Sequence, residues 1–148
     1  MPGFNLSARS LQRLDGVHPR LVEIVKLAIQ RTAVDFTVVE GVRTAERQRE
    51  LVAQGASQTQ NSLHLKQQDG FGHAVDLAPL VGGTIPWANW EAFIAVADAM
   101  RSASLQVGVS IRWGGSWTLL SELPKTITRS ILHKTFPDGP HYEIKGLR

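Results

Sequence analysis

The chain of 148 residues contains no cysteine. It can therefore form no disulfide and offer no thiolate to a metal, so any metal must bind to histidine, aspartate or glutamate. No apolar run approaches the roughly 18 residues that suggest a membrane span, and we expect no stable membrane association. Residues 1–14 are polar and contain no apolar core, which argues against a secretory signal.

Internal repeats, low-complexity tracts and long linkers are also missing. A hydrophobic content of 43% and a charged content of 20% are ordinary for a folded protein of this length. The net charge is +3, but the lysines and arginines are scattered rather than clustered. We therefore predict one domain over residues 1–148, and nucleic-acid binding is not indicated.

Apolar spacing and capping residues predict three helices. Pro19 can open the first, because its missing N–H is not needed there, and Thr44 is a good cap for the second. The third carries Trp87, Trp90 and Phe93, which we expect to lie in the core. The predicted helices cover residues 19–29, 45–54 and 87–103.

Short apolar or β-branched runs predict strands at residues 35–42, 74–80, 109–113 and 141–144. The stretch from 118 to 135 is expected to be a loop with one helical turn. The strands are bunched late and alternate irregularly with the helices. This order favours an α+β fold with a small, mainly antiparallel sheet packed with helices.

A few polar residues could carry chemistry. Asp76 lies among apolar neighbours, and a buried carboxylate needs a cation or strong donors opposite it. Zinc is one answer, and a buried arginine or a cap is the other. His64 and His141 offer imidazoles, and Asp138 lies close before His141, although this segment could equally be an ordinary turn. Together they supply the three ligands and the nearby base that a catalytic zinc site needs.

Five short motifs occur in order along residues 15–144. They are Val39-Glu40-Gly41-Val42-Arg43-Thr44, Ser62-Leu63-His64, Gly72-His73-Ala74-Val75-Asp76-Leu77, Trp113-Gly114-Gly115 and Asp138-Gly139-Pro140-His141-Tyr142. This arrangement resembles the M15 zinc peptidases, most closely the phage L-alanyl-D-glutamate endopeptidases, which are endolysins. The resemblance implies the fold that D-alanyl-D-alanine peptidases share with hedgehog signalling domains.

Carried over to this sequence, the resemblance implies a zinc ion bound by His64, Asp76 and His141. Asp138 then takes the position of the catalytic carboxylate, and Arg43 that of the active-site arginine. Without the resemblance, a surface ion pair of Arg43 with a neighbouring glutamate would be the plainer interpretation.

Other residues are candidates for supporting or contacting the substrate. Ser62 matches the family's serine and is expected to support the site or touch the substrate. Trp113 and Trp117 flank two glycines and could line a substrate groove or simply pack. Glu143 follows His141 on the same strand face, where it could support the imidazole, but a solvated glutamate is the expected reading.

The sequence departs from the family pattern in three places. The stretch between His64 and Asp76 is longer than usual, and residues 66–71 are interpreted as a looped insertion. His73 lies nearer to Asp76, but three residues apart in a strand place the two side chains on opposite faces. Residues 121–135 also look longer than in relatives, and Ser116 stands where phage members often have aspartate.

The leading functional prediction is therefore hydrolysis of the L-alanyl-D-glutamate bond in peptidoglycan stem peptides by a phage lytic enzyme. A carboxypeptidase or dipeptidase acting on D-alanyl-D-alanine ends is the nearest alternative. A zinc-binding domain without catalysis is the other. We expect a monomer without a separate wall-binding module, held in the cytoplasm of a Gram-negative host until the inner membrane opens.

Overall fold

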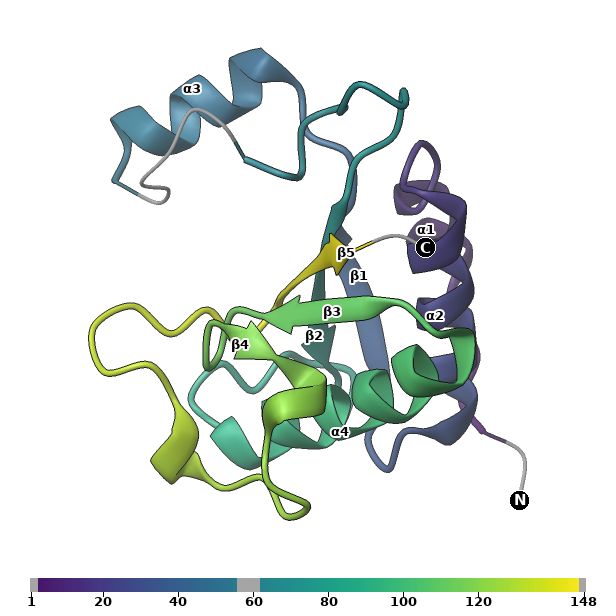
Figure 1. Cartoon of the computed structure of the whole chain (residues 1–148), viewed down its shortest axis with the longest axis vertical. Coiled ribbons are helices and arrows are strands. Elements are labelled where there is room, and N and C mark those ends of the chain that lie inside the picture. Colours follow the sequence, from purple (N-terminus) through teal and green to yellow (C-terminus); the bar gives the residue numbers. More distant parts are fainter. Residues whose placement is uncertain (1–2, 56–61, 147–148) are drawn as a thin grey trace.

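The computed structural model describes residues 3–55 and 62–146, and a five-stranded sheet forms its centre (Figure 1). The strand order is β1-β2-β5-β3-β4, and every neighbouring pair is antiparallel. This confirms the predicted α+β class. The strands are β1 Phe36–Glu40, β2 Ala74–Pro79, β3 Ser110–Trp113, β4 Thr118–Leu119 and β5 His141–Gly146.

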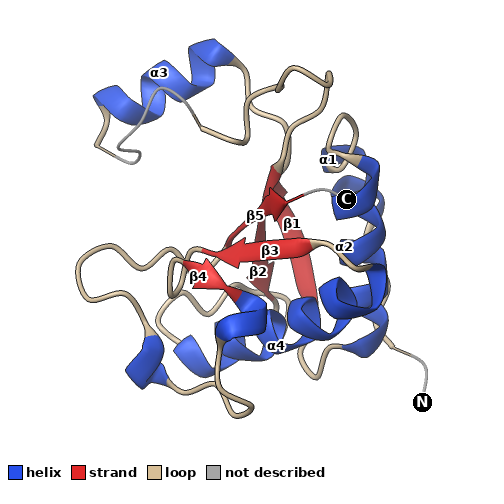
Figure 2. Ribbon diagram, viewed as in Figure 1, coloured by secondary structure: helices blue, strands red, loops and turns tan. Residues whose placement is uncertain are grey.

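The sheet register lines up three ionisable residues across neighbouring strands. Glu40 of β1 is paired with Asp76 of β2, and Asp76 is paired with His141 at the start of β5. The last strand of the chain thus inserts between β2 and β3, as Figure 2 shows. This topology places residues far apart in the sequence side by side.

Two long helices, α2 Pro19–Arg31 and α4 Trp90–Val107, supply much of the core. The inner face of α2 includes Leu21 and Ile24, and that of α4 includes Val96 and Met100, all of them buried. Burying one such side chain contributes about 1.5–3 kcal/mol relative to leaving it exposed. The helix α2 begins at Pro19, as the sequence predicted.

Helix α4 begins later than predicted and ends later. Asn89 caps it by accepting a hydrogen bond from the Ala92 amide, and Gly108 ends it in the left-handed conformation with φ 83°. Trp87 therefore lies outside the helix and is 61% exposed. The expectation that Trp87 belongs to the core is wrong, whereas Phe93 is buried and Trp90 is half-buried.

Helix α1, Ala8–Arg13, was not predicted, because six mostly polar residues carry no clear helical pattern. The Ser7 side chain caps it, and the Ser10 hydroxyl accepts a hydrogen bond from the Val38 amide. The 118–135 stretch contains β4 and two short 3-10 turns, η1 Leu120–Glu122 and η2 Arg129–Ile131. The loop prediction was therefore close but missed the small strand.

Helix α3, Ala45–Ala53, stands apart from the sheet (Figure 1). The Thr44 side chain caps it as predicted, accepting a hydrogen bond from the Arg47 amide. Gln48 is its buried residue and turns back towards the sheet. The predicted loop from 58 to 72 is described only from residue 62 onwards.

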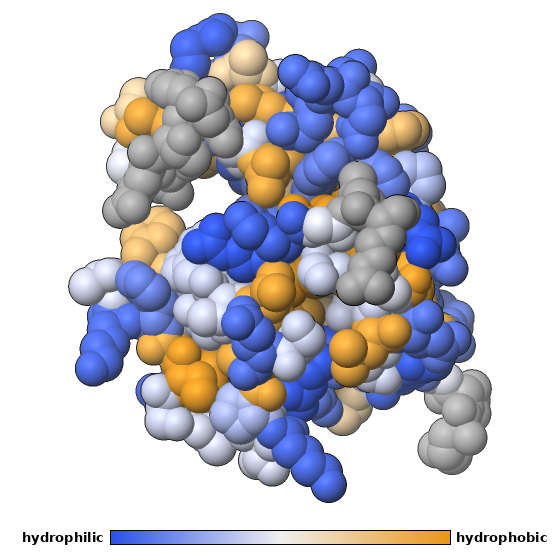
Figure 3. All heavy atoms as spheres, in the orientation of Figure 1, coloured by the Kyte–Doolittle hydropathy of each residue, from blue (hydrophilic) through white to orange (hydrophobic). Residues whose placement is uncertain are grey.

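Apolar and polar residues are mixed along the helices and over the surface of the described part of the chain. Over the described residues, no helix is long and apolar enough to cross a bilayer. On the face drawn in Figure 3, hydrophilic and hydrophobic residues are interspersed. Single exposed apolar residues of this kind are normal for a folded protein.

Candidate active site

The structure brings His64, Asp76 and His141 together. One ligand atom from each lies within 4.8 Å of the others. His64 Nε2 is 3.2 Å from Asp76 Oδ1, and His141 Nδ1 is 3.5 Å from the same oxygen. The register of β2 and β5 explains the second contact, because Asp76 and His141 are direct cross-strand partners.

Backbone hydrogen bonds fix the two ends of the predicted insertion and so hold His64 in place. The His64 carbonyl accepts from the Arg43 amide at 2.8 Å, and the His73 amide donates to the Leu63 carbonyl at 2.7 Å. Between them, residues 66–71 close on themselves, with the Gln67 amide donating to the Phe71 carbonyl. The insertion therefore leaves the two ends where the site needs them.

His73 does not join this group. Its Nε2–H donates to Asp69 at 2.7 Å, and its ring lies 5.4 Å from that of His18. This placement agrees with the expectation that His73 and Asp76, three residues apart, point to opposite faces. His18 accepts a hydrogen bond from the Arg20 amide and caps α2.

The tautomers of the two imidazoles make a case for a cation at this site. His64 Nδ1 is 2.9 Å from the Gly41 carbonyl, which can only accept, so Nδ1 carries the proton. His141 Nε2 is 2.7 Å from Glu143 Oε1 and donates to it in the same way. When both imidazoles are neutral, as metal ligands must be, two nitrogen lone pairs face the carboxylate of Asp76, and such acceptors repel unless a cation lies between them. This buried group could therefore bind a metal ion.

The pKa values agree with a site that attracts positive charge. Burial alone would raise the pKa of Asp76, but hydrogen bonds and charges from His141 and His64 hold it well below its usual range. Burial alone would lower the pKa of His141, but hydrogen bonds to Asp76 and Glu143 raise it to about 9. Asp76 is thus a permanent anion.

Glu143 was expected to be solvated, and this expectation is wrong. It is only 8% exposed and its side chain contacts His141. The signal was present in the sequence, because residues two apart in a strand share a face. What the sequence lacked was any sign that this face is covered.

Asp138 lies in the turn that leads into β5. Its amide donates to the Gly114 carbonyl at 2.8 Å, and its own carbonyl accepts from the His141 amide at 3.1 Å. Burial and the negative charge of Asp76 raise the pKa of Asp138, although His141, His64 and Arg43 act in the opposite direction. A raised pKa suits a carboxyl group that must both take and release a proton.

Arg43 is buried rather than on the surface. Its guanidinium makes a two-pronged contact with Glu40, at 2.9 and 2.7 Å, and donates to Gln48 at 2.6 Å. It also reaches towards Asp76, with Nη2 3.6 Å from Oδ2. The plainer interpretation correctly expected a glutamate partner, but the ion pair is buried beside Asp76 rather than on the surface.

The three remaining candidates are buried or half-buried. Trp113 is 0% exposed, stacks on Tyr142 and donates to the Gly139 carbonyl, so it packs and cannot line a groove. Trp117 is half-buried, and its ring lies 5.3 Å from that of His141. The Ser62 hydroxyl accepts from the His64 amide at 3.1 Å, which is a supporting contact.

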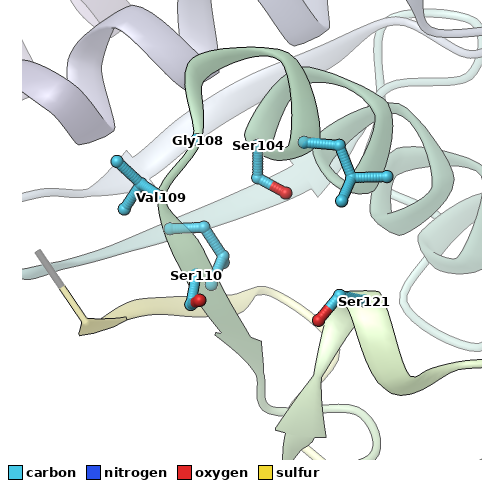
Figure 4. A pocket seen from close by; sticks show the side chains of 7 residues that line it. Ser104, Gly108, Val109, Ser110 and Ser121 are labelled. Atoms are coloured by element: carbon cyan, nitrogen blue, oxygen red, sulfur yellow. The ribbon is translucent and has the colours of Figure 1, made fainter. Parts of the chain in front are cut away.

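A surface pocket lies away from this group and is lined by serines, a glycine and aliphatic residues. Figure 4 shows this pocket between the end of α4, β3 and η1, where Ser104, Ser110 and Ser121 face it. No ionisable side chain lines it. This pocket therefore offers no ionisable acid or base.

Comparisons with known proteins agree with this geometry. The family model "Phage L-alanyl-D-glutamate peptidase" matches residues 2–145. The L-alanyl-D-glutamate peptidase of Escherichia phage T5 is 30% identical over 141 residues, covering 95% of this chain and 98% of that protein. The peptidase of the same name from Listeria phage A118 is 29% identical over 89 residues, 60% of this chain and 28% of its own.

A solved structure is similar as well. The Serratia marcescens L-Ala D-Glu endopeptidase ChiX superimposes with a TM-score of 0.74 at 38% identity, covering 93% of this chain and 87% of that one. The likeness extends over most of both chains.

Proposed function

Because the chain belongs to the phage L-alanyl-D-glutamate peptidase family, we propose that it is a zinc-dependent endopeptidase of peptidoglycan. It hydrolyses the amide bond between L-alanine and D-glutamate in the stem peptide, acting as one catalytic domain over residues 1–148. The observation that carries the proposal is the convergence of His64, Asp76 and His141 on one point, with Asp138 beside them.

The donor set fits zinc. Two imidazole nitrogens and one carboxylate oxygen are ligands that zinc accepts, and three protein ligands leave a position open for catalysis. His64 would bind through Nε2, His141 through Nδ1 and Asp76 through its carboxylate. When bound, zinc supplies a Lewis acid that polarises the scissile carbonyl and activates water for attack.

Asp138 is proposed as the general base. Its raised pKa reflects a half-buried carboxyl group beside Asp76. Asp138 takes the proton of the attacking water and hands it to the leaving amine of D-glutamate, so one group serves both half-steps. Two hydrogen bonds of its backbone, to Gly114 and His141, fix its position.

Arg43 is proposed to stabilise the negative charge that develops on the carbonyl oxygen. Its cation is permanent, and Glu40 and Gln48 prevent it from turning away. A donor that is already oriented needs no rearrangement during the reaction. Ser62 supports this wall of the site through its hydrogen bond to the His64 amide.

Mass analysis of digested, purified murein tests the proposal. We expect new amino termini on D-glutamate, loss of activity with a chelator and recovery with added zinc. Products that have lost only terminal D-alanine would favour the carboxypeptidase or dipeptidase reading. A zinc-loaded protein without any turnover would favour a binding domain.

We further propose that the substrate is the wall of a Gram-negative host, reached from the host cytoplasm once the inner membrane is open, and that the protein acts as a monomer. The similarity over 95% of this chain to a peptidase of Escherichia phage T5 supports the Gram-negative host. Cells with a permeabilised outer membrane should lyse on external addition, whereas intact cells should not.

A further inference from the structure

His141 is held by the carboxylate of Glu143. Oε1 of Glu143 lies 2.7 Å from Nε2 of His141, and both side chains are about nine-tenths buried. With the proton on Nε2, the lone pair of Nδ1 faces Asp76 at 3.5 Å. The contact with Glu143 therefore selects the tautomer that a metal at this site requires.

The ring of His141 has a second support in Trp117. The two rings lie 5.3 Å apart and are tilted by 42°. Among the residues that the structure describes, Trp117 is the only non-glycine residue with a positive φ, which is 56°. A non-glycine residue in this region is strained by about 1–3 kcal/mol, and such strain persists only where neighbours impose it.

Arg112 connects both supports. It is the cross-strand partner of Glu143, with Nη1 3.7 Å from Oε2. Its Nε donates to the Trp117 carbonyl at 3.1 Å, and its guanidinium lies over the Trp117 ring, 5.2 Å from the ring centre. One side chain thus contacts the carboxylate that orients His141 and the strained residue that packs against it.

We propose that Glu143 is the positioning residue of His141, and that Arg112 holds Glu143 and Trp117 in place for it. The inference rests on the proposed metal centre but concerns metal affinity rather than cleavage. A plain cross-strand ion pair between Arg112 and Glu143 is the competing explanation. The distances favour positioning, because Glu143 lies 2.7 Å from the imidazole and 3.7 Å from the guanidinium.

The test compares zinc affinity by chelator competition in full-length wild type, Glu143→Ala and Glu143→Gln. We expect Glu143→Ala to bind zinc about 10–100-fold more weakly, the usual loss when the partner of a ligating histidine is removed. Glu143→Gln keeps the shape and an acceptor oxygen, so its loss should be smaller. Lys145→Ala is the matched control, since Lys145 is exposed on the same face of β5.

Nuclear magnetic resonance of the zinc-loaded proteins supplies a second readout. The Nε2–H of His141 should be visible and slow to exchange in wild type and Glu143→Gln, and lost in Glu143→Ala. Arg112→Ala should weaken zinc binding in the wild type, and by less in the Glu143→Ala background, where only its contacts with Trp117 remain. An additive loss would remove Arg112 from the proposal.

Unchanged zinc affinity and a retained Nε2–H signal in Glu143→Ala would overturn the positioning role. The peptidase proposal fails differently, through a wild type that binds zinc but leaves murein intact. Because glutamine has nearly the same size and shape as glutamate, zinc affinity can be measured in Glu143→Gln even where Glu143→Ala does not fold.

Discussion

Gly114 offers a sharp test of the site geometry. It follows β3 and packs directly against the segment that carries Asp138 and His141. A Cβ at this position would overlap the Asp138 carbonyl oxygen and lie 2.9 Å from Cβ of His141 and 3.0 Å from Cβ of Asp138. Gly114→Ala therefore forces the two neighbours to move, since most of these atoms belong to the backbone or its first carbon.

The size of the effect follows from how tightly this position is fixed. The Gly114 amide donates to the His141 carbonyl and its carbonyl accepts from the Asp138 amide, both at 2.8 Å. Overpacking of this kind typically destabilises by about 1–3 kcal/mol. For a chain of this length that corresponds to a fall in melting temperature of roughly 2–12 °C. Because a displacement of about 1 Å at a catalytic group can cost about 10²-fold in rate, activity should fall much further than stability alone explains.

Thermal unfolding and murein turnover measured on the same preparations check this prediction. Gly146→Ala is the matched control, because Gly146 lies in β5 and its added Cβ would meet nothing within 4 Å. It should behave like wild type in both assays. A Gly114→Ala protein with unchanged melting temperature and unchanged turnover would refute the close packing of Gly114 on the site.

Four further predictions concern single side chains. Asp138→Asn should keep its zinc and fold but lose activity by about 10²-fold or more, in steady-state kinetics with metal analysis; near-normal turnover would remove Asp138 as the base. His64→Ala should lose zinc by metal analysis, and full occupancy would mean that another residue replaces it. Arg43→Lys keeps the charge but not the two-pronged contact with Glu40, so kcat should fall more than KM rises; wild-type kinetics would leave Arg43 a purely structural role. Burial lowers the pKa of His18 from 6.5, and the charge of Asp69 opposes this shift. The unfolded chain therefore binds a proton at His18 more readily than the folded one, so stability should fall as the pH drops below 6.5. His18→Ser keeps a cap and should flatten this fall in urea unfolding at several pH values, whereas an unchanged slope would assign it to other groups.

Local signals in the sequence determined the start of α2 and the whole of α3. Pro19 opens α2 because its fixed φ suits a first turn, and Thr44 caps α3 through its own hydroxyl. Such signals act between neighbours along the chain, so they can be read without a fold. The same reasoning failed for α4, where the apolar spacing reaches back to Trp87 but the cap at Asn89 excludes it.

The ordered motifs also determined the family and the three metal-binding candidates. Their identity needed no tertiary information, because the motifs occur in the family's order along the sequence. The length of the stretch after His64 left its position open. Only the structure showed that backbone hydrogen bonds from Arg43 and His73 fix the ends of the insertion, and that the bond from Gln67 to Phe71 closes it.

Tertiary structure alone decided which residues surround those candidates. A strand's period of two tells that His141 and Glu143 share a face, but only the position of β5 between β2 and β3 brings Asp76 and Arg112 to that face. Trp113, which the sequence could equally have placed at a groove, is buried because it packs in the hydrophobic core and stacks on Tyr142. Alternation along a strand is a local property of the backbone, whereas burial depends on which distant strand or helix covers it, and no stretch of sequence specifies that by itself.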